Sequence, residues 1–174
     1  MPTALSWEHW LEDIPTTGLA VERVADAGER QLIAAALDLN ACCELSARYH
    51  ITPLSLDRYR LTGELTAKIE QTCVVTLEPV AALIADSYAA TYWPEAAMPE
   101  PAAGQLDLNA AEPEPEPIVG GKIDVGRIIF ESLAAAIDPF PRRPGAVFEG
   151  PLSAPTASEP ESPFAVLASL KDKR

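Results

Sequence analysis

Apolar and polar residues alternate over two stretches in the middle of the chain. In residues 42–51, one face of a predicted strand consists of Cys43, Leu45, Ala47, Tyr49 and Ile51. The same two-residue period continues from Tyr59 to Leu77, and it is typical of a strand with one buried face. Because this second stretch is longer than a usual strand, we expect a bulge or a bend at Gly63. A third strand is predicted from Pro79 to Trp93.

The period changes to that of a helix in two other stretches. Asp26 is a potential N-cap with Glu29 at the capping-box position, which predicts a helix over residues 26–38. Its expected buried face is Leu32, Ile33, Ala36 and Leu37. A second helix is predicted from Asp124 to Asp138, with apolar residues at helical spacing. Together these elements predict an α+β fold, in which an antiparallel β-meander has helices packed on one face.

Two stretches of low hydrophobicity interrupt this pattern. Residues 94–117 are rich in proline and acidic residues and contain no base, which predicts a flexible acidic loop. Residues 151–162, PLSAPTASEPES, have the composition of a linker. We therefore expect one α+β domain over residues 1–150, then this linker, then a short C-terminal helical motif over residues 163–174.

The C-terminal motif combines an apolar stripe with a basic end. Ser162 can cap a helix, and Phe164, Leu167 and Leu170 follow at spacing three, with Lys171 where a helix C-terminus favours cations. About ten residues do not hold a helix in water on their own. We expect the motif to become ordered against a surface, either that of a partner or that of its own domain.

Charge restricts the class of partner. The 174 residues carry a net charge of -13, which argues against tight non-specific binding to nucleic acid because phosphates repel carboxylates. Acidic residues near the N-terminus argue against a signal peptide, so we expect none, and no apolar run reaches the length of a membrane span. The odd number of cysteines fits a reducing compartment, so we expect a cytoplasmic protein.

Three cysteines and one of the two histidines are potential metal ligands. By number, Cys42, Cys43, Cys73 and His50 could supply four zinc ligands. Structural zinc sites use cysteine pairs separated by two residues, whereas adjacent cysteines on a strand point to opposite faces. We therefore expect no metal and no other cofactor, with Cys43 and Cys73 buried in the core.

Two weaker candidates lie between the sheet and the second helix. Gly120 and Gly121 could expose N–H groups to an anion, although a hinge is the more common role. Glu112, Glu114 and Glu116 alternate with prolines, which predicts extended, solvated carboxylates. The chain contains no nucleophile elbow, P-loop or dinucleotide fingerprint.

Arg142 and Arg143 lie between prolines directly after the second helix, in the stretch IDPFPRRPGAVF. The prolines stiffen this stretch, and the two cations could recognise an anionic partner. The alternative is a pair of solvated arginines that the helix dipole favours.

Three stretches together resemble a known family: QTCVVTLEPV (71–80), IDPFPRRPGAVF (137–148) and SPFAVLASLK (162–171), preceded by ADAGERQLIAAAL. They are similar to the YceD family, the large ribosomal RNA subunit accumulation proteins of bacteria, and in particular to its alphaproteobacterial branch. The resemblance extends from Leu5 to Lys171. It implies a cytoplasmic protein needed for accumulation of large-subunit ribosomal RNA, with no catalytic residue to transfer. Many members carry a C-x-x-C pair where this chain has Cys73 and Thr76.

The sequence thus favours a non-enzymatic factor that binds a ribosomal protein, large-subunit ribosomal RNA, or both. Its acidity favours the ribosomal protein. The candidate partner-binding residues are Arg142, Arg143, Phe164, Leu167, Leu170 and Lys171. One alternative is an enzyme acting on RNA or nucleotides, whose site would use Glu64, Lys68, Glu70 and His50. Another is a structural subunit of a larger complex.

Overall fold

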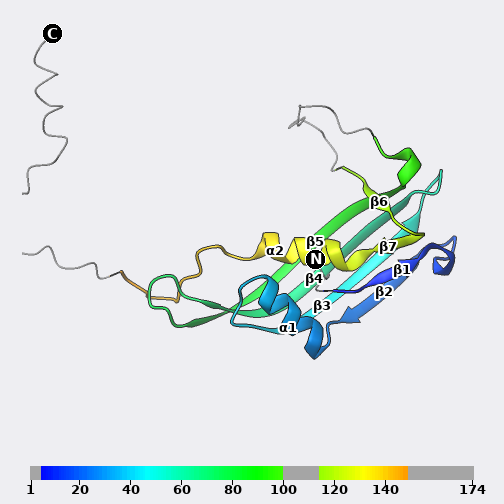
Figure 1. Ribbon diagram of the computed structural model, residues 1–174. Coiled ribbons are helices and arrows are strands. Elements are labelled where there is room, and N and C mark those ends of the chain that lie inside the picture. Colours follow the sequence, from blue (N-terminus) through cyan, green and yellow to red (C-terminus); the bar gives the residue numbers. More distant parts are fainter. Residues whose placement is uncertain (1–4, 100–113, 149–174) are drawn as a thin grey trace, which may run out of the picture.

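The computed structural model describes residues 5–99 and 114–148, which form a five-stranded sheet, a two-stranded sheet and two α-helices (Figure 1). The predicted α+β class is confirmed. The larger sheet has the order β2-β3-β4-β5-β6; its first four strands pair antiparallel, and β6 pairs parallel with β5. The element bounds are β1 Glu8–Trp10, β2 Leu19–Val24, α1 Ala27–Ala36, β3 Ala41–Pro53, β4 Tyr59–Thr72, β5 Pro79–Pro94, β6 Glu116–Ile118, β7 Lys122–Asp124 and α2 Val125–Ala136.

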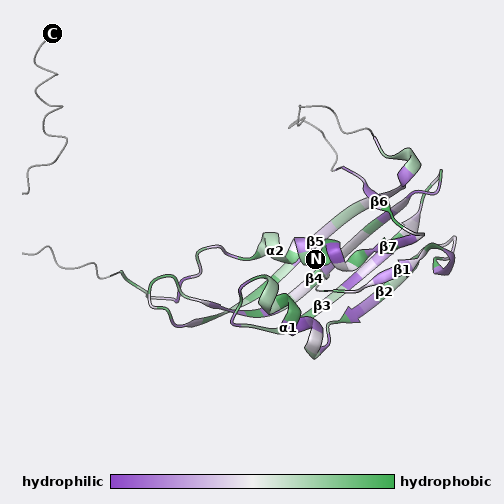
Figure 2. Ribbon diagram, in the orientation of Figure 1, coloured by the Kyte–Doolittle hydropathy of each residue, from purple (hydrophilic) through white to green (hydrophobic). Residues whose placement is uncertain are grey.

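Both helices and the small β1–β7 sheet lie on one side of the large sheet (Figure 1). Figure 2 shows hydrophobic residues on both helices. Ile33 of α1 and Ile129 and Leu133 of α2 are fully buried against the inward-facing side chains of β3, β4 and β5. Trp7, from the segment before β1, is also buried in this core. The opposite face of the large sheet is polar along β3 and β4.

The helix N-termini follow the sequence closely. Asp26 and Glu29 form the predicted capping box: Glu29 N–H donates to Asp26 Oδ1 at 2.8 Å, and Asp26 N–H donates to Glu29 Oε2 at 2.9 Å. Asp124 caps α2 by accepting from Arg127 N–H at 3.0 Å. The expected buried face of α1 is wrong at Leu32, which is 52% exposed, and at Ala36, which is also exposed, because only Ile33 points fully into the core.

Gly126 allows the N-terminal segment to pack against the start of α2. Trp7 O accepts from the N–H groups of Val125 and Gly126 at 3.0 and 3.2 Å. A Cβ at position 126 would lie 2.5 Å from Leu5 O, a distance that no side chain tolerates. Glycine is therefore required where this backbone crosses the helix.

The predicted faces of the two cysteines in β3 are interchanged. Cys42 is buried and Cys43 is exposed, because the β3–β4 register shifts between Cys42 and Glu44. A bulge of this kind adds one residue and reverses the alternation on one side of it. The bulge therefore lies at Cys43 in β3, and the expected bulge at Gly63 is wrong, since β4 pairs without interruption there.

The strand predicted from Tyr59 to Leu77 ends earlier, at Thr72. Residues 73–77 form a turn, in which Leu77 has a left-handed φ of 58° and is 77% exposed. The alternation of Cys73, Val75 and Leu77 in the sequence therefore does not reflect a strand. The polypeptide reverses direction there and returns as β5.

The ends of the predicted acidic loop belong to the fold. Pro94 ends β5, and Glu116 begins β6. Glu116 is not a solvated carboxylate, because it forms an ion pair with Arg127 of α2 at 2.6 Å. The rest of the loop, residues 100–113, lies outside the described residues, as do the expected linker and C-terminal motif. In the described part of the chain, no helix is long and apolar enough to cross a membrane.

Candidate interaction surface around Cys73

The turn between β4 and β5, residues 73–78, closes around the sulfur of Cys73. We call it the cysteine turn. Cys73 N–H donates to Glu78 O at 2.8 Å, and Leu77 N–H donates to Cys73 O at 3.0 Å. Inside the turn, the N–H groups of Val75 and Thr76 both point at Cys73 Sγ, each at 3.4 Å. The buried sulfur thus serves as the acceptor that organises the turn.

The segment after α2, residues 138–148, packs against this turn, and we call it the proline–arginine segment. Val74 N–H donates to Pro141 O at 2.9 Å, and Arg143 N–H donates to Cys73 Sγ at 3.4 Å. Gln71, the only buried polar side chain of the described residues, donates from Nε2 to Asp138 O at 2.9 Å. Two of the sequence stretches that resemble the YceD family therefore meet in space.

Charge and hydrogen bonding stabilise this junction. Arg143 forms an ion pair with Glu78, and this contact lowers the pKa of the Glu78 carboxyl. Hydrogen bonds from the Thr76 side chain and from the backbone N–H groups of Arg143 and Thr76 lower the pKa of Cys73 to about 6, although burial opposes the shift. The fold therefore favours the thiolate of Cys73.

The two candidate arginines have different environments. The Arg143 side chain and backbone both bind the cysteine turn, so this residue supports the local structure. Arg142 is exposed, and it forms no ion pair within the described residues. Of the two, Arg142 is the cation available to a partner. The other candidate residues, Phe164, Leu167, Leu170 and Lys171, lie outside the described part of the chain.

Large apolar side chains are exposed around the junction. Val74 and Leu77 of the cysteine turn are 46% and 77% exposed, and Phe140 of the proline–arginine segment is 69% exposed. We call these three residues the apolar tip. Val147 and Phe148, at 74% and 76%, continue the exposed apolar run along the segment. Single exposed apolar residues are ordinary, but a group on one rigid junction indicates an interaction surface.

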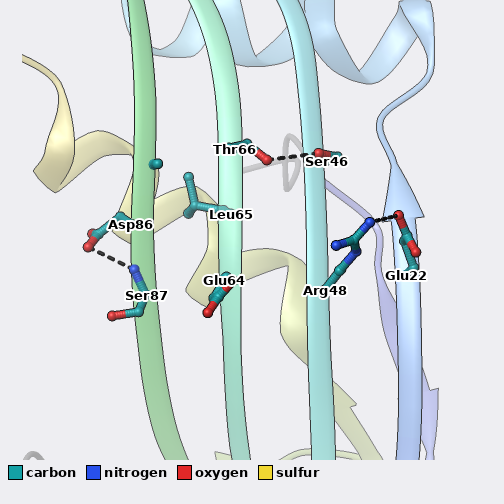
Figure 3. Close-up of a pocket in the computed structure, with 9 residues that line it drawn as sticks. Glu22, Ser46, Arg48, Glu64, Leu65, Thr66, Asp86 and Ser87 are labelled. Carbon is teal, nitrogen blue, oxygen red and sulfur yellow. Dashed lines mark hydrogen bonds and ion pairs between the residues drawn. The ribbon is translucent and has the colours of Figure 1, made fainter.

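The polar face of the sheet offers a hollow with a different character (Figure 3). Its volume is ≈ 440 Å³, and its floor is formed by residues from β2 to β5. Most of its polar groups already have partners: Arg48 binds Glu22 at 3.0 Å, and the hydroxyls of Ser46 and Thr66 lie 3.1 Å apart. Paired, exposed groups of this kind form a solvated surface.

The residues of the enzyme alternative are not assembled into a catalytic group. Glu64, Lys68 and Glu70 are spread along the same face of β4, and Lys68 pairs with Glu44 at 2.8 Å. His50 Nδ1 lies 2.9 Å from Thr52 Oγ1 on its own strand. Among residues 5–99 and 114–148, no three His, Cys, Asp or Glu side chains are grouped as a metal site would require.

Sequence reasoning missed the structural role of Gln71. In the alternation of β4, this glutamine takes a position on the buried face, between Ile69 and Cys73. A polar residue at a core position needs a hydrogen-bond partner, so it signals a contact from another segment. The sequence did not reveal that this segment begins at Asp138.

The fold and this surface define a small α+β protein in which two distant segments form a hydrogen-bonded junction with exposed apolar side chains. Residues 61–171 match the model of a family described as Large ribosomal RNA subunit accumulation protein YceD. The match covers more than half of the chain, so the chain belongs to the YceD family. It includes both the cysteine turn and the proline–arginine segment. Searches of curated proteins and of solved structures gave no match.

Proposed function

We propose that this protein is a cytoplasmic, non-enzymatic factor in the accumulation of large-subunit ribosomal RNA, and that it binds a ribosomal protein or the RNA itself. The family description supports the process, since it names accumulation rather than a reaction. The observation that carries the binding role is the junction of the cysteine turn with the proline–arginine segment. It holds the apolar tip and Arg142 in a fixed arrangement at one end of the sheet.

The proposed contact has two parts. The apolar tip supplies the buried area that an interface needs at its centre, and Arg142 supplies a cation at its rim. The C-terminal motif, with Phe164, Leu167, Leu170 and Lys171, is proposed as a second contact, joined to the domain by the linker. The alphaproteobacterial resemblance of these stretches forms part of the same proposal.

Complementation tests this function. Cells lacking the protein would receive wild-type chain, Phe140→Ser or Arg142→Glu, and the ratio of large- to small-subunit ribosomal RNA would be measured with co-sedimentation on ribosomal particles. Both variants should fold normally, because both side chains are exposed, and both should fail to restore the ratio.

Matched controls come from surfaces away from the tip. Val24→Ser removes an apolar side chain that is 69% exposed at the end of β2, and Arg60→Glu reverses an exposed charge on β4. Both controls should restore the ratio. Equal failure of Val24→Ser and Phe140→Ser would refute a specific role of the tip.

Truncation tests the second contact. A chain ending at Glu161 should keep the sheet signals of the wild type and fail to restore the ribosomal RNA ratio. If this chain complements fully, the C-terminal motif has no role in binding.

The enzyme alternative makes the opposite prediction for the polar face. A double substitution, Glu64→Gln with Lys68→Met, removes two of its candidate groups. Under the binding proposal this variant restores the ribosomal RNA ratio, whereas an enzyme using these groups would lose activity.

A further inference from the structure

The outer edge of β5 has no neighbouring strand over most of its length. On its inner side, β5 pairs with β4 from Pro79 to Tyr92. On its outer side, β6 pairs only with Tyr92, Trp93 and Pro94. Residues 79–91 therefore form a free sheet edge among the described residues, and the edge begins directly after the cysteine turn.

The hydrogen bond that closes the cysteine turn shows which backbone groups face this edge. Cys73 N–H donates to Glu78 O, and in an antiparallel ladder such bonded pairs recur at every second residue. With the uninterrupted β4–β5 register, the even-numbered residues of β5 point their N–H and C=O groups at β4. The odd-numbered residues from Ala81 to Thr91 point theirs outward.

One outward group already has a substitute partner. Ser87 N–H donates to the Asp86 carboxylate at 2.8 Å, as Figure 3 shows. For the N–H groups of Ala81, Leu83, Ala85 and Ala89, the described residues provide no acceptor. These four residues are exposed, and Leu83 is 72% exposed. Unpaired backbone groups in a row are a template for an added strand.

The edge of β6 is protected in a way that the edge of β5 is not. The backbone N–H and C=O groups of Trp93 point toward β6. In a parallel ladder they bond to the residues on either side of the directly opposite residue, Pro117, and these are Glu116 and Ile118. Pro117 consequently directs its nitrogen, which carries no hydrogen, to the far side. Proline thus blocks strand addition beyond β6. The outward-facing proline of β5, Pro79, lies at the start of the strand. From Ala81 to Thr91, β5 contains no proline, and the Asp86 carboxylate caps only the N–H of Ser87.

We infer that the free edge of β5 binds an extended, basic segment of a partner polypeptide as an additional strand. The ladder selects a polypeptide, because only a peptide backbone presents N–H and C=O groups at the strand spacing. Asp86 is the only charged residue of β5, and its carboxylate favours a partner segment that carries a cationic side chain. When an incoming carbonyl takes over Ser87 N–H, the Asp86 carboxylate is released to pair with a lysine or arginine of the partner.

Charge opposes two other occupants of this edge, a second copy of the chain and RNA. A second copy would bring two Asp86 carboxylates and two chains of net charge -13 together, so self-pairing is opposed. RNA has no ladder groups and is repelled by the same carboxylate. The inference goes beyond the proposed function, because it concerns a site that the apolar tip does not form.

The test uses the full-length protein and a nine-residue peptide of alternating lysine and valine. Amide hydrogen exchange by NMR should slow on peptide addition at Ala81, Leu83, Ala85 and Ala89, and remain unchanged at the even-numbered residues, which β4 already protects. A glutamate–valine peptide and spermine, a polycation without a peptide backbone, should have no such effect. RNA oligonucleotides should not compete with the peptide.

Variants locate the site. Asp86→Lys should weaken peptide binding about tenfold, while Glu12→Lys, which changes the net charge equally on another exposed surface, should weaken it by less than about threefold. Phe140→Ser should bind the peptide normally, so failure of the tip proposal would leave this result intact. The inference is overturned if the peptide does not bind, if protection lacks the odd-numbered pattern, if these amides are already protected in the free chain, or if the protein dimerises through β5.

Discussion

The apolar tip and the free edge of β5 adjoin each other in the chain but expose opposite kinds of group. At the cysteine turn, backbone N–H groups bond to Cys73 Sγ, Glu78 O and Pro141 O, and large apolar side chains face outward. Along β5, the N–H groups of Ala81, Leu83, Ala85 and Ala89 have no acceptor in the described structure, and three of these four residues are alanine. A partner of the tip is selected by side-chain shape, and a partner of the edge by its backbone.

This difference determines how each surface responds to mutation. At the tip, the hydrogen bonds that fix the surface are separate from the side chains that would contact a partner. Substitutions beneath the surface should change stability, and substitutions on it should change binding. At the edge, the binding groups belong to the backbone, apart from the Asp86 carboxylate, so side-chain substitutions at the other exposed residues of the edge should change neither stability nor binding.

The largest effect on stability is expected for Cys73→Ala. The substitution leaves the N–H groups of Val75, Thr76 and Arg143 without their acceptor and creates a small cavity. The thermal midpoint should fall by about 5 °C in scanning calorimetry. Cys43→Ala, at the exposed bulge, is the matched control and should leave the midpoint unchanged. Equal midpoints for the two variants would show that the sulfur does not organise the turn.

A smaller loss of stability is expected for Gln71→Leu. The leucine fits the buried position but cannot donate to Asp138 O, so the proline–arginine segment loses one of its attachments to the sheet. We expect the free energy of unfolding in urea to fall by about 1 kcal/mol. Amide exchange at Val74 and Arg143 should accelerate more than exchange in β3. Thr72→Ala, at an exposed neighbouring residue, serves as the control, and uniform acceleration throughout the sheet would contradict a local role of Gln71.

The contribution of Cys73 should depend on pH. The fold lowers the pKa of this thiol from 9.0 to about 6, so the folded state binds its proton more weakly than the unfolded state does. The stabilisation of the fold by the Cys73 thiolate is therefore complete above the pKa of the unfolded thiol, and it is lost as the pH falls through about 6. Under reducing conditions, the difference in midpoint between wild type and Cys73→Ala should grow steadily from about pH 5.5 to about pH 9. A constant difference would mean that the sulfur remains a neutral thiol.

The sequence predicted the features that depend on local chemistry. The cap at Asp26, the start of the second helix at Asp124 and the strands β3 and β5 were recognisable because a few neighbouring residues determine them. The bulge at Cys43 was not, because a single inserted residue leaves an alternation that is equally regular on either side of it. The strands β1, β2, β6 and β7 were also missed; β1, for example, is three residues long and depends on pairing with β7, more than a hundred residues away.

For the same reason, the sequence indicated the two segments of the candidate surface but not their contact. The stretches 71–80 and 137–148 were identified separately, but their contact depends on the position of α2 above the sheet. The sequence assigned the same role to Arg142 and Arg143, because adjacent residues of one type look equivalent. Only the ion pair with Glu78 distinguishes Arg143 as a structural residue.

The smallest effects on stability are expected for substitutions of exposed side chains, and a matched pair of them compares binding at the tip with binding at the edge. Phe140 at the tip and Leu83 at the edge are 69% and 72% exposed, so serine at either position should shift the thermal midpoint by less than about 2 °C. Their binding effects should differ. Phe140→Ser should abolish restoration of the ribosomal RNA ratio, because the proposed function places this ring in the contact with the partner. Leu83→Ser should bind the lysine–valine peptide within about threefold of wild type, because the outward N–H and C=O groups of residue 83 remain in place. If Leu83→Ser loses the peptide while Phe140→Ser still complements, the assignment of side-chain recognition to the tip and backbone recognition to the edge is reversed.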